Sequence, residues 1–365
     1  MTGIAPAARA ASPSTVVVPR DFPTIQAAVD AAASGSTIVV RRGTYTEEVV
    51  VSGKDVHLKG EGAPVIKAPA TLTPYATGRG DRPLTSIVRI ARGAHVGMSG
   101  FTVTGPVPCG QVVSGIVALQ AATLELSHSR VLDIHPDPTC SEDEASGRAV
   151  VIGLPRFAQV DGAAGSTASG RIDHVTIARY QVDGINLNGP DDAPSRATVA
   201  DTVITGGGLR IPAEQFGIAV GHAVATLTGN TVSDSVCTFQ GCGPDPLNEF
   251  QGGGIFVQNA PPGTKISGNH ISHTDVGIYQ YASPDCCRIK DNKLKDNRFF
   301  GIVIQDGDGE THHNTITGGQ VGIGVVAGAL NTTGTLHGDR ISGTTDAPVR
   351  EIQCCGFTAT AVVKD

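Results

Sequence analysis

The chain has 365 residues, with 47 glycines, no tryptophan, 4% aromatic residues and a formal net charge of −7. Hydrophobic residues make up 40% of it, enough for a sizeable core, so a disordered chain is excluded. Glycine shows no three-residue period, which excludes collagen, and no apolar run reaches the roughly 18 residues of a membrane span. A mildly acidic chain without a dense basic block also argues against nucleic acid as a partner.

Residues 1–18 are rich in Ala, Pro and Ser and predict a disordered terminus or the remnant of an export signal. Residues 19–365 are expected to form one domain. Its first element is an amphipathic helix over residues 22–34, with Thr24 as N-cap and Gly35 as the C-terminal stop. The apolar face of this helix consists of Ile25, Ala28, Val29 and Ala32. Strands are expected next, at residues 37–40, 48–51 and 56–58.

Short strands that begin with Gly-Ile then recur about every 22 residues, with longer insertions between the earlier ones. They start at Gly115, Gly184, Gly217, Gly254, Gly277, Gly301 and Gly322. Each unit also holds two alternating strands on either side of a polar position, so three strands per unit predict one coil of a parallel β-helix. The polar positions are His128, His174, Asp201, Asn230, Asn269, Asn292 and Asn314, which we expect to stack from coil to coil in a left-handed backbone conformation.

Three early segments carry a more specific signal. Asp21–Ala32, Gly43–Val49 and Val56–Gly62 resemble the start of pectin-lyase-like right-handed β-helix proteins, which include pectin methylesterases, polysaccharide lyases, glycosidases, alginate epimerases and NosD-like proteins. The resemblance implies an all-β, single-stranded right-handed parallel β-helix, a solenoid of about 22-residue coils with an N-terminal capping helix. The Gly-Tyr-Gln-Asp motif of the methylesterases is present only as residues 180–183 with one inserted residue, so that activity is not carried over.

The resemblance also implies an active cleft on the sheet of Gly-Ile strands. If the isoleucines point inward, alternation turns a polar and partly aromatic strip outward, a composition suited to sugars. The strip contains Asn186, Asn188, Ala219, Gly221, Phe256, Gln258, Tyr279, Tyr281, Val303 and Gln305. An ordinary solvated sheet face is the alternative interpretation.

Long loops before these strands, at residues 105–113, 135–147, 205–215 and 233–252, are expected to form a wall beside the strip. A glycosidase needs two carboxylates, one of them protonated, and Glu214 and Glu249 precede adjacent strands, with Asp275 close by. A lyase needs a base and a cation, and its candidates are His222, Tyr281, Arg210 and Arg298. Asp183 is a further candidate acid, for which an ion pair with Arg148 is the alternative explanation.

One cation site is also considered. Asp306, Asp308 and Glu310 offer the oxygen ligands that Ca²⁺ prefers, although they lack the EF-hand pattern. No other cofactor is expected.

The eight cysteines predict disulfides formed in an oxidising compartment. We expect Cys109 to pair with Cys140 and Cys237 with Cys242. The neighbouring pairs Cys286-Cys287 and Cys354-Cys355 are expected to cross-link late coils or the C-terminal end, with their pairing left open.

These patterns predict a secreted or extracytoplasmic polysaccharide lyase or glycoside hydrolase that acts on a polysaccharide or oligosaccharide in a groove on the Gly-Ile sheet. The alternative is a non-catalytic binding or structural β-helix, NosD-like or a surface protein. The strip bears no charged side chain, which favours the alternative, whereas the loop wall and the clustered Tyr, Gln and Asn favour an enzyme.

Overall fold

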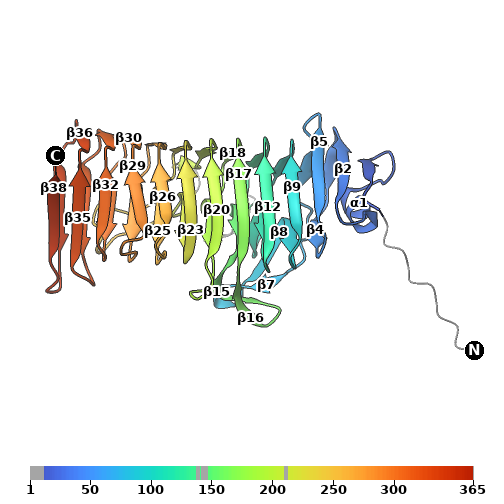
Figure 1. Cartoon of the computed structure of the whole chain (residues 1–365), viewed down its shortest axis with the longest axis horizontal. Helices are drawn as coiled ribbons and strands as arrows, with labels where there is room; N and C mark the ends of the chain where they lie inside the picture. Colours follow the sequence, from blue (N-terminus) through green and yellow to red (C-terminus); the bar gives the residue numbers. More distant parts are fainter. Residues whose placement is uncertain (1–11, 137–139, 141–146, 209–212, 365) are drawn as a thin grey trace, which may run out of the picture.

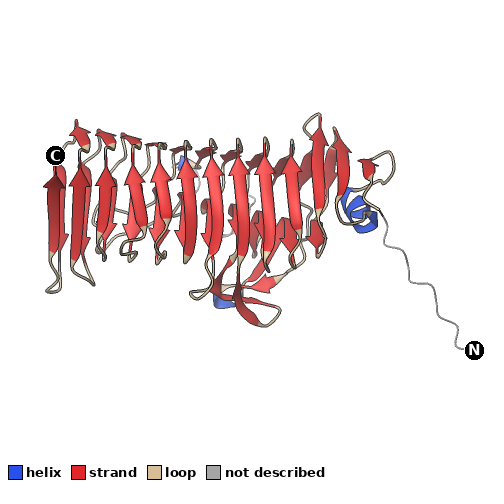
Figure 2. Cartoon of the chain, in the orientation of Figure 1, coloured by secondary structure: helices blue, strands red, loops and turns tan. Residues whose placement is uncertain are grey.

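The computed structural model describes residues 12–136, 140, 147–208 and 213–364. The chain winds through three long sheets, and the coils stack along one axis from the capping helix to the last strand (Figure 1). Strands make up nearly all of the regular secondary structure of the described residues (Figure 2). This is the predicted parallel β-helix.

Within the described residues, sheet A has thirteen strands that follow one another from coil to coil. They are β1 (Thr15–Val18), β2 (Ser36–Arg41), β5 (Val56–Glu61), β9 (His95–Ser99), β12 (Ala122–Ser127), β17 (Ala168–Asp173), β20 (Ser195–Ala200), β23 (Ala223–Thr228), β26 (Thr264–Ser267), β29 (Cys287–Lys290), β32 (Gly309–His312), β35 (Thr332–His337) and β38 (Ala359–Lys364).

Sheet B has eleven short strands in the part of the chain that the structure describes. They are β3 (Thr44–Thr46), β6 (Val65–Lys67), β10 (Thr102–Thr104), β13 (Arg130–Leu132), β18 (Thr176–Ala178), β21 (Val203–Thr205), β24 (Thr231–Ser233), β27 (His270–Ser272), β30 (Lys293–Lys295), β33 (Thr315–Thr317) and β36 (Arg340–Ser342).

Sheet C, with fourteen strands among the residues described, contains the Gly-Ile strands. They are β4 (Val49–Ser52), β7 (Ala76–Thr77), β8 (Pro83–Ala91), β11 (Val112–Ala118), β14 (Gly147–Ile152), β15 (Leu154–Val160), β16 (Ala163–Ser166), β19 (Asp183–Asn188), β22 (Phe216–Gly221), β25 (Gly253–Gln258), β28 (Val276–Tyr281), β31 (Phe300–Gln305), β34 (Val321–Ala327) and β37 (Ala347–Gln353). The hairpin β15–β16 was not predicted; it is antiparallel and projects beside the solenoid (Figure 1).

The N-terminal cap is shorter than expected. Helix α1 (Ile25–Ala31) begins after Thr24, whose hydroxyl accepts the Ala27 N–H at 3.1 Å, but Ala32 is already extended. A short 3-10 turn, η1, covers Arg79–Asp81. Strand β1 pairs with β2, adds one more strand to sheet A and buries Val18. Residues 15–18 are therefore ordered, contrary to the disorder predicted up to residue 18. Residues 1–11 lie outside the described part.

The core is a column of aliphatic side chains stacked between the sheets. In sheet C, Ile185, Ile218 and Ile255 lie in register, followed by the isoleucines of later coils, and all are fully buried. The glycine before each isoleucine has a packing reason: a Cβ at Gly217 would collide with Val232, and one at Gly254 with Ile271. No side chain fits there, which explains the recurrence of Gly-Ile.

Asparagine amides form a buried ladder along the axis, as predicted, but the left-handed conformation expected of them lies on the residue before each, as at Gly268 and Asp291. Asn269 donates from Nδ2 to Leu227 O and to Asn292 Oδ1, both at 3.0 Å, and Asn292 repeats the pattern on Asn314. Each amide thus satisfies the backbone and side chain of neighbouring coils.

The early part of this ladder corrects the predicted alignment. His128, His174 and Asp201 adopt left-handed conformations, with φ of 46°, 52° and 47°. Each lies one position before the ladder. In these early coils the ladder positions are occupied by residues such as Ser129 and Thr202 instead of asparagine. The left-handed residue turns the chain, and only the following side chain reaches the neighbouring coil.

We expect Asn292→Ala to lower the free energy of unfolding by about 2–4 kcal/mol, because the substitution removes the bonds that satisfy buried groups of two neighbouring coils. Chemical denaturation measures the change. Lys293→Ala, at an exposed position next to it, is the control and should change stability by less than about 0.5 kcal/mol. Equal stability of the two variants would contradict the role of the ladder.

Candidate functional site

The outer face of sheet C does not follow simple alternation. Asp183 pairs with Phe216 and Ile185 with Ile218. A Cβ at the intervening Gly184 would meet Ile204 of the core, so this glycine faces inward like the isoleucine after it and is skipped in the alternation. The residue before each glycine therefore faces outward together with the predicted strip. This break places Asp183 on the same face as Asn186, and the Asn186 amide donates to the Asp183 carboxylate at 2.7 Å.

Asp183 is held by a polar network. Arg148, one coil earlier, donates from Nε to Asp183 Oδ2 at 2.9 Å. This is the ion pair that was the alternative explanation for Asp183. The Asp183 side chain is only 4% exposed. Burial raises the pKa of Asp183, and the Arg148 guanidinium and the Asn186 amide oppose that rise. Asn188 in turn donates to Asn186, so the network continues along the strip.

Glu214 has a pKa near neutrality. It directly precedes the buried Gln215 and strand β22, and forms an antiparallel bridge with Cys237. Burial raises the pKa of Glu214 to about 7, and the negative charges of Asp183 and Asp275 add to the rise, while the Gln251 N–H opposes it. A carboxylic acid that holds its proton near pH 7 is suited to general acid catalysis.

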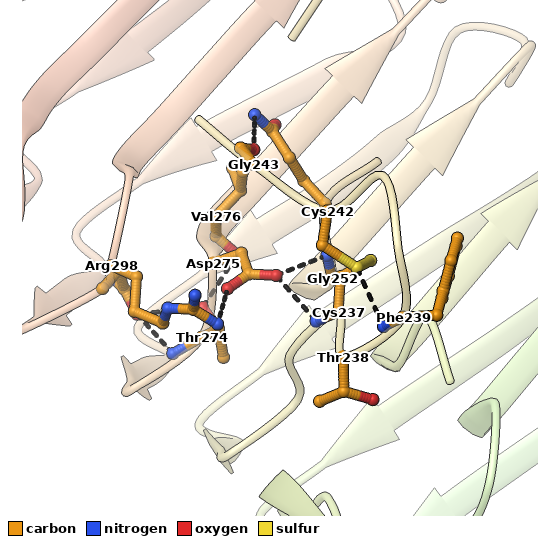
Figure 3. Close-up of polar contacts among 12 residues, drawn as sticks. Cys237, Thr238, Phe239, Cys242, Gly243, Gly252, Thr274, Asp275, Val276 and Arg298 are labelled. Carbon is orange, nitrogen blue, oxygen red and sulfur yellow. Dashed lines mark hydrogen bonds and ion pairs between the residues drawn. A yellow bond between two sulfur atoms is a disulfide. The ribbon is translucent and has the colours of Figure 1, made fainter. Parts of the chain in front are cut away.

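Asp275 anchors the neighbouring loop (Figure 3). Its Oδ2 accepts the Cys237 N–H at 2.7 Å and the Gly252 N–H at 2.9 Å, one at each end of the loop between β24 and β25. Its Oδ1 lies 2.9 Å from Arg298 Nη1, and the Asp275 side chain is fully buried. Burial raises the pKa of Asp275, while the two backbone donors and the Arg298 charge oppose the rise.

The loop of residues 237–252 covers the later part of the strip. A disulfide joins Cys237 to Cys242 inside it. Leu247 of this loop packs against an apolar cluster on the outer face that includes Val303 and Val326, both fully buried. The predicted outward direction of Val303 is therefore consistent with the register, but the loop shields it from solvent.

An aromatic row lies beside Glu214. The rings of Phe216 and Phe256 stack at 4.7 Å, and Tyr279 meets Phe256 edge-on at 5.5 Å. Tyr281 lies 6.4 Å from Tyr279 between ring centroids. Burial raises the pKa of Tyr279, and the nearby charges of Tyr281, Asp306 and Glu214 add to the rise. The row thus places a tyrosine ring within the electrostatic field of Glu214.

The amides of the strip are placed around these rings. Tyr279 donates its hydroxyl to Gln305, which is 6% exposed, and Gln258 pairs in register with Tyr281 and remains partly exposed. Asn186, Asn188, Gln258, Tyr279 and Tyr281 all lie on the predicted face. Arg210, the remaining predicted contact, lies outside the described residues.

His222 lies apart from these acids. It follows the last residue of β22, whereas Glu214 precedes the first, and a six-residue strand separates them by about 20 Å. His222 Nδ1 is 2.7 Å from Asp191 Oδ1, and Arg156 donates to the same carboxyl at 2.8 Å and lowers its pKa. The structure therefore does not bring His222 together with Glu214.

Glu249 stays within its own loop. It is exposed, and its Oε2 accepts the Asp245 N–H at 2.8 Å. The acids whose charges act on Glu214 are Asp183 and Asp275. The sequence predicts Asp275 close to Glu214, but it pairs Glu214 with Glu249. It leaves Asp183 apart from them, because the skipped glycine that turns Asp183 outward leaves no signal in a strict alternation.

The predicted Ca²⁺ ligands do not converge. Asp306 Oδ1 accepts the N–H groups of Gly328 and Ala329, both at 2.7 Å, and so holds the turn of the next coil. Asp308 Oδ1 accepts the Thr333 N–H at 2.7 Å. Glu310 lies instead on sheet A, where its carboxylate is 3.4 Å from His312 Nε2. Backbone N–H groups thus already bond to the carboxylates of Asp306 and Asp308.

Two disulfides form as predicted, Cys109–Cys140 and Cys237–Cys242. The remaining four cysteines correct the expectation of cross-links between coils. Cys286 bonds to Cys287 and Cys354 to Cys355, so each of these bonds joins two residues that are adjacent in the chain and links no two coils.

Comparisons with known proteins agree on the fold. Residues 161–335 match the family model of a right handed beta helix region. The lacto-N-biosidase of Eubacterium ramulus is similar, with a TM-score of 0.58 and 12% identity over 87% of this chain and 62% of that one. Tailspike protein 2 of an Escherichia coli bacteriophage has a TM-score of 0.51 and 13% identity over 89% of this chain and 42% of that one. No curated protein sequence matches.

The fold is a right-handed parallel β-helix. The chain spans less than two thirds of the length of either of these two structures. Within the described residues, no helix is long and apolar enough to cross a membrane.

The raised pKa of Glu214 predicts a pH-dependent stability. Its folded value of about 7 lies above the ordinary 4.5, so the folded state keeps a proton that the unfolded chain loses between these values. The contribution of this proton to the free energy of unfolding is complete below pH 4.5 and is lost as the pH rises through about 7. The total loss is about 3 kcal/mol. Denaturation of wild type and Glu214→Gln between pH 4 and 8 (roughly the window of the shift) should show a steeper fall of stability with pH in the wild type, because Asp183 and Asp275, whose pKa values are also raised, contribute to the slope of both proteins. Parallel curves would contradict the shift.

The buried Asp275 predicts a stability effect localised to its loop. Asp275→Ala leaves two buried N–H groups without an acceptor, and should cost about 2–3 kcal/mol and speed proteolysis within residues 238–251. Asp275→Asn, whose amide oxygen still accepts, should lose less. Chemical denaturation and a protease time course measure both effects. Equal proteolysis rates in wild type and Asp275→Ala would show that the loop is held by other contacts.

Proposed function

We propose that the protein is an extracytoplasmic carbohydrate-active enzyme that binds a polysaccharide or oligosaccharide along the outer face of sheet C and cleaves it with Glu214 as general acid. The observation that carries the proposal is the pKa of Glu214, about 7, beside a row of aromatic and amide side chains. Such rings pack against the apolar faces of sugars, while amides bind their hydroxyl groups.

The carboxylates around Glu214 support hydrolysis in particular. Glycosidases use one protonated and one ionised carboxyl group on either side of the bond. Glu214 supplies the protonated group, and Asp183, next to Arg148, is the candidate for the ionised one. A lyase would need a free cation to neutralise a uronate carboxylate, but Arg148 and Arg298 are both already paired with acids.

Two further observations support the setting of this activity. The four disulfides fit an oxidising, extracytoplasmic compartment. The similar structure from Eubacterium ramulus is named as a biosidase, a sugar-cleaving activity stated for that protein, which has the same fold. Both are consistent with a carbohydrate substrate.

A non-catalytic carbohydrate-binding β-helix is the second candidate. In its favour, Asp183 is already paired with Arg148, and Asp275 with Arg298 and backbone N–H groups. Of these three acids, only Glu214 has no ion pair among the described residues. The aromatic row serves this function equally well.

The test compares Glu214→Gln with wild type on a panel of neutral and uronate polysaccharides. We expect Glu214→Gln to lower cleavage by roughly 100-fold or more while binding is kept, and wild-type cleavage to fall as the pH rises above about 7. Reducing ends report hydrolysis, and ultraviolet absorbance of an unsaturated product reports elimination. Glu249→Gln, a carboxylate confined to its own loop, is the matched control and should keep full activity.

The outcomes separate the candidates. Full activity of Glu214→Gln would remove this acid from the mechanism, and an unsaturated product would select a lyase. If a polymer is bound but not cleaved, and Phe256→Ala abolishes that binding, the non-catalytic function stands.

A further inference from the structure

Two imidazoles and a carboxylate meet on the outer face of sheet A in the late coils, away from sheet C. Strands β32 and β35 pair in parallel with Glu310 opposite Thr335 and His312 opposite His337. Residues two apart on a strand share a face, so Glu310 and His312 point outward together. Register then brings His337 beside His312 on the same face, since Thr311 and Leu336 point into the core.

The geometry of these three side chains is close to that of a metal site. The rings of His312 and His337 stack with centroids 4.5 Å apart and planes inclined by 4°. His312 Nε2 lies 3.4 Å from Glu310 Oε2, and the three ligand atoms lie within 4.8 Å of one another. Bonds of about 2.0–2.1 Å to Zn²⁺ put ligand atoms up to about 4.2 Å apart. A metal lies in the plane of each imidazole that binds it, so the two partly exposed rings must turn out of their stacked arrangement to complete the site.

We propose that Glu310, His312 and His337 bind a borderline divalent cation such as Zn²⁺, with water at the remaining positions. The donor set of two imidazoles and one carboxylate suits Zn²⁺, Ni²⁺ or Cu²⁺, whereas Ca²⁺ prefers oxygen ligands alone. The metal links β32 to β35 and so clamps two successive coils near the C-terminal end of the solenoid.

Basic side chains beside the three ligands lower the affinity of the site for a cation. Arg288 pairs in register with Glu310, Lys290 with His312 and Lys364 with His337. Lys290 is itself 3.2 Å from the Asp291 carboxylate, which offsets part of its charge. The site is therefore expected to be weaker than a buried structural zinc site.

A second cluster on the surface helps to design the test. Asp173, His174 and Asp201 also bring their ligand atoms within 4.8 Å of one another, but this set contains one imidazole instead of two. Borderline metals favour nitrogen donors, so the cluster with two histidines should bind more tightly. Measurements must therefore be read as differences between variants.

The experiment titrates Zn²⁺ into the full chain by calorimetry and follows thermal unfolding with and without Zn²⁺. His312→Ala and His337→Ala should each weaken the tightest site by roughly tenfold or more and remove the Zn²⁺-dependent rise in melting temperature. His270→Ala, an exposed strand histidine of sheet B, is the matched control and should behave as wild type.

Circular dichroism without metal checks that each variant is folded. Ca²⁺ at the same concentration should neither compete with Zn²⁺ nor raise the melting temperature. Unchanged Zn²⁺ affinity and an unchanged melting shift in both His312→Ala and His337→Ala would overturn the proposal. Because the readouts are binding and stability, the result is independent of the proposed hydrolase activity.

Discussion

In-register stacking of identical positions from one coil to the next is the constraint on which this molecule depends. Each strand satisfies its backbone donors and acceptors through the coils before and after it, so a residue must tolerate its own equivalents directly above and below. Isoleucine does so in the core and asparagine in the ladder, where each amide bonds to the next. Glycine is required where the core leaves no space for a Cβ, as at Gly254.

The same stacking builds the candidate site. It brings Arg148 next to Asp183 across β14 and β19, and Phe256 next to Tyr279 across β25 and β28. The loop anchored on Asp275 then closes one side and places the Gln251 N–H on Glu214. Burial from this loop and two nearby negative charges together raise the pKa of Glu214 to about 7. A neutral acid on a rigid sheet face is thus a product of packing rather than of any single residue.

Much of the architecture could be predicted from local pattern. The Gly-Ile repeat, the asparagine positions and the capping Thr24 each report a local requirement that is visible within a few residues. The direction of the strip followed from alternation in the same way. Alternation fails at the skipped glycine, and this is why the outward position of Asp183 and its grouping with Glu214 could not be foreseen.

The sequence by itself determined the solenoid, its three strands per coil and the pairing of Cys109 with Cys140 and Cys237 with Cys242, because repeated short-range patterns encode them. Only the tertiary structure decided which acids act on one another. It separated His222 from Glu214 by the length of a strand, and it confined Glu249 to its own loop. Electrostatic coupling depends on distance and burial in space, and neither quantity is contained in the spacing of residues along the chain.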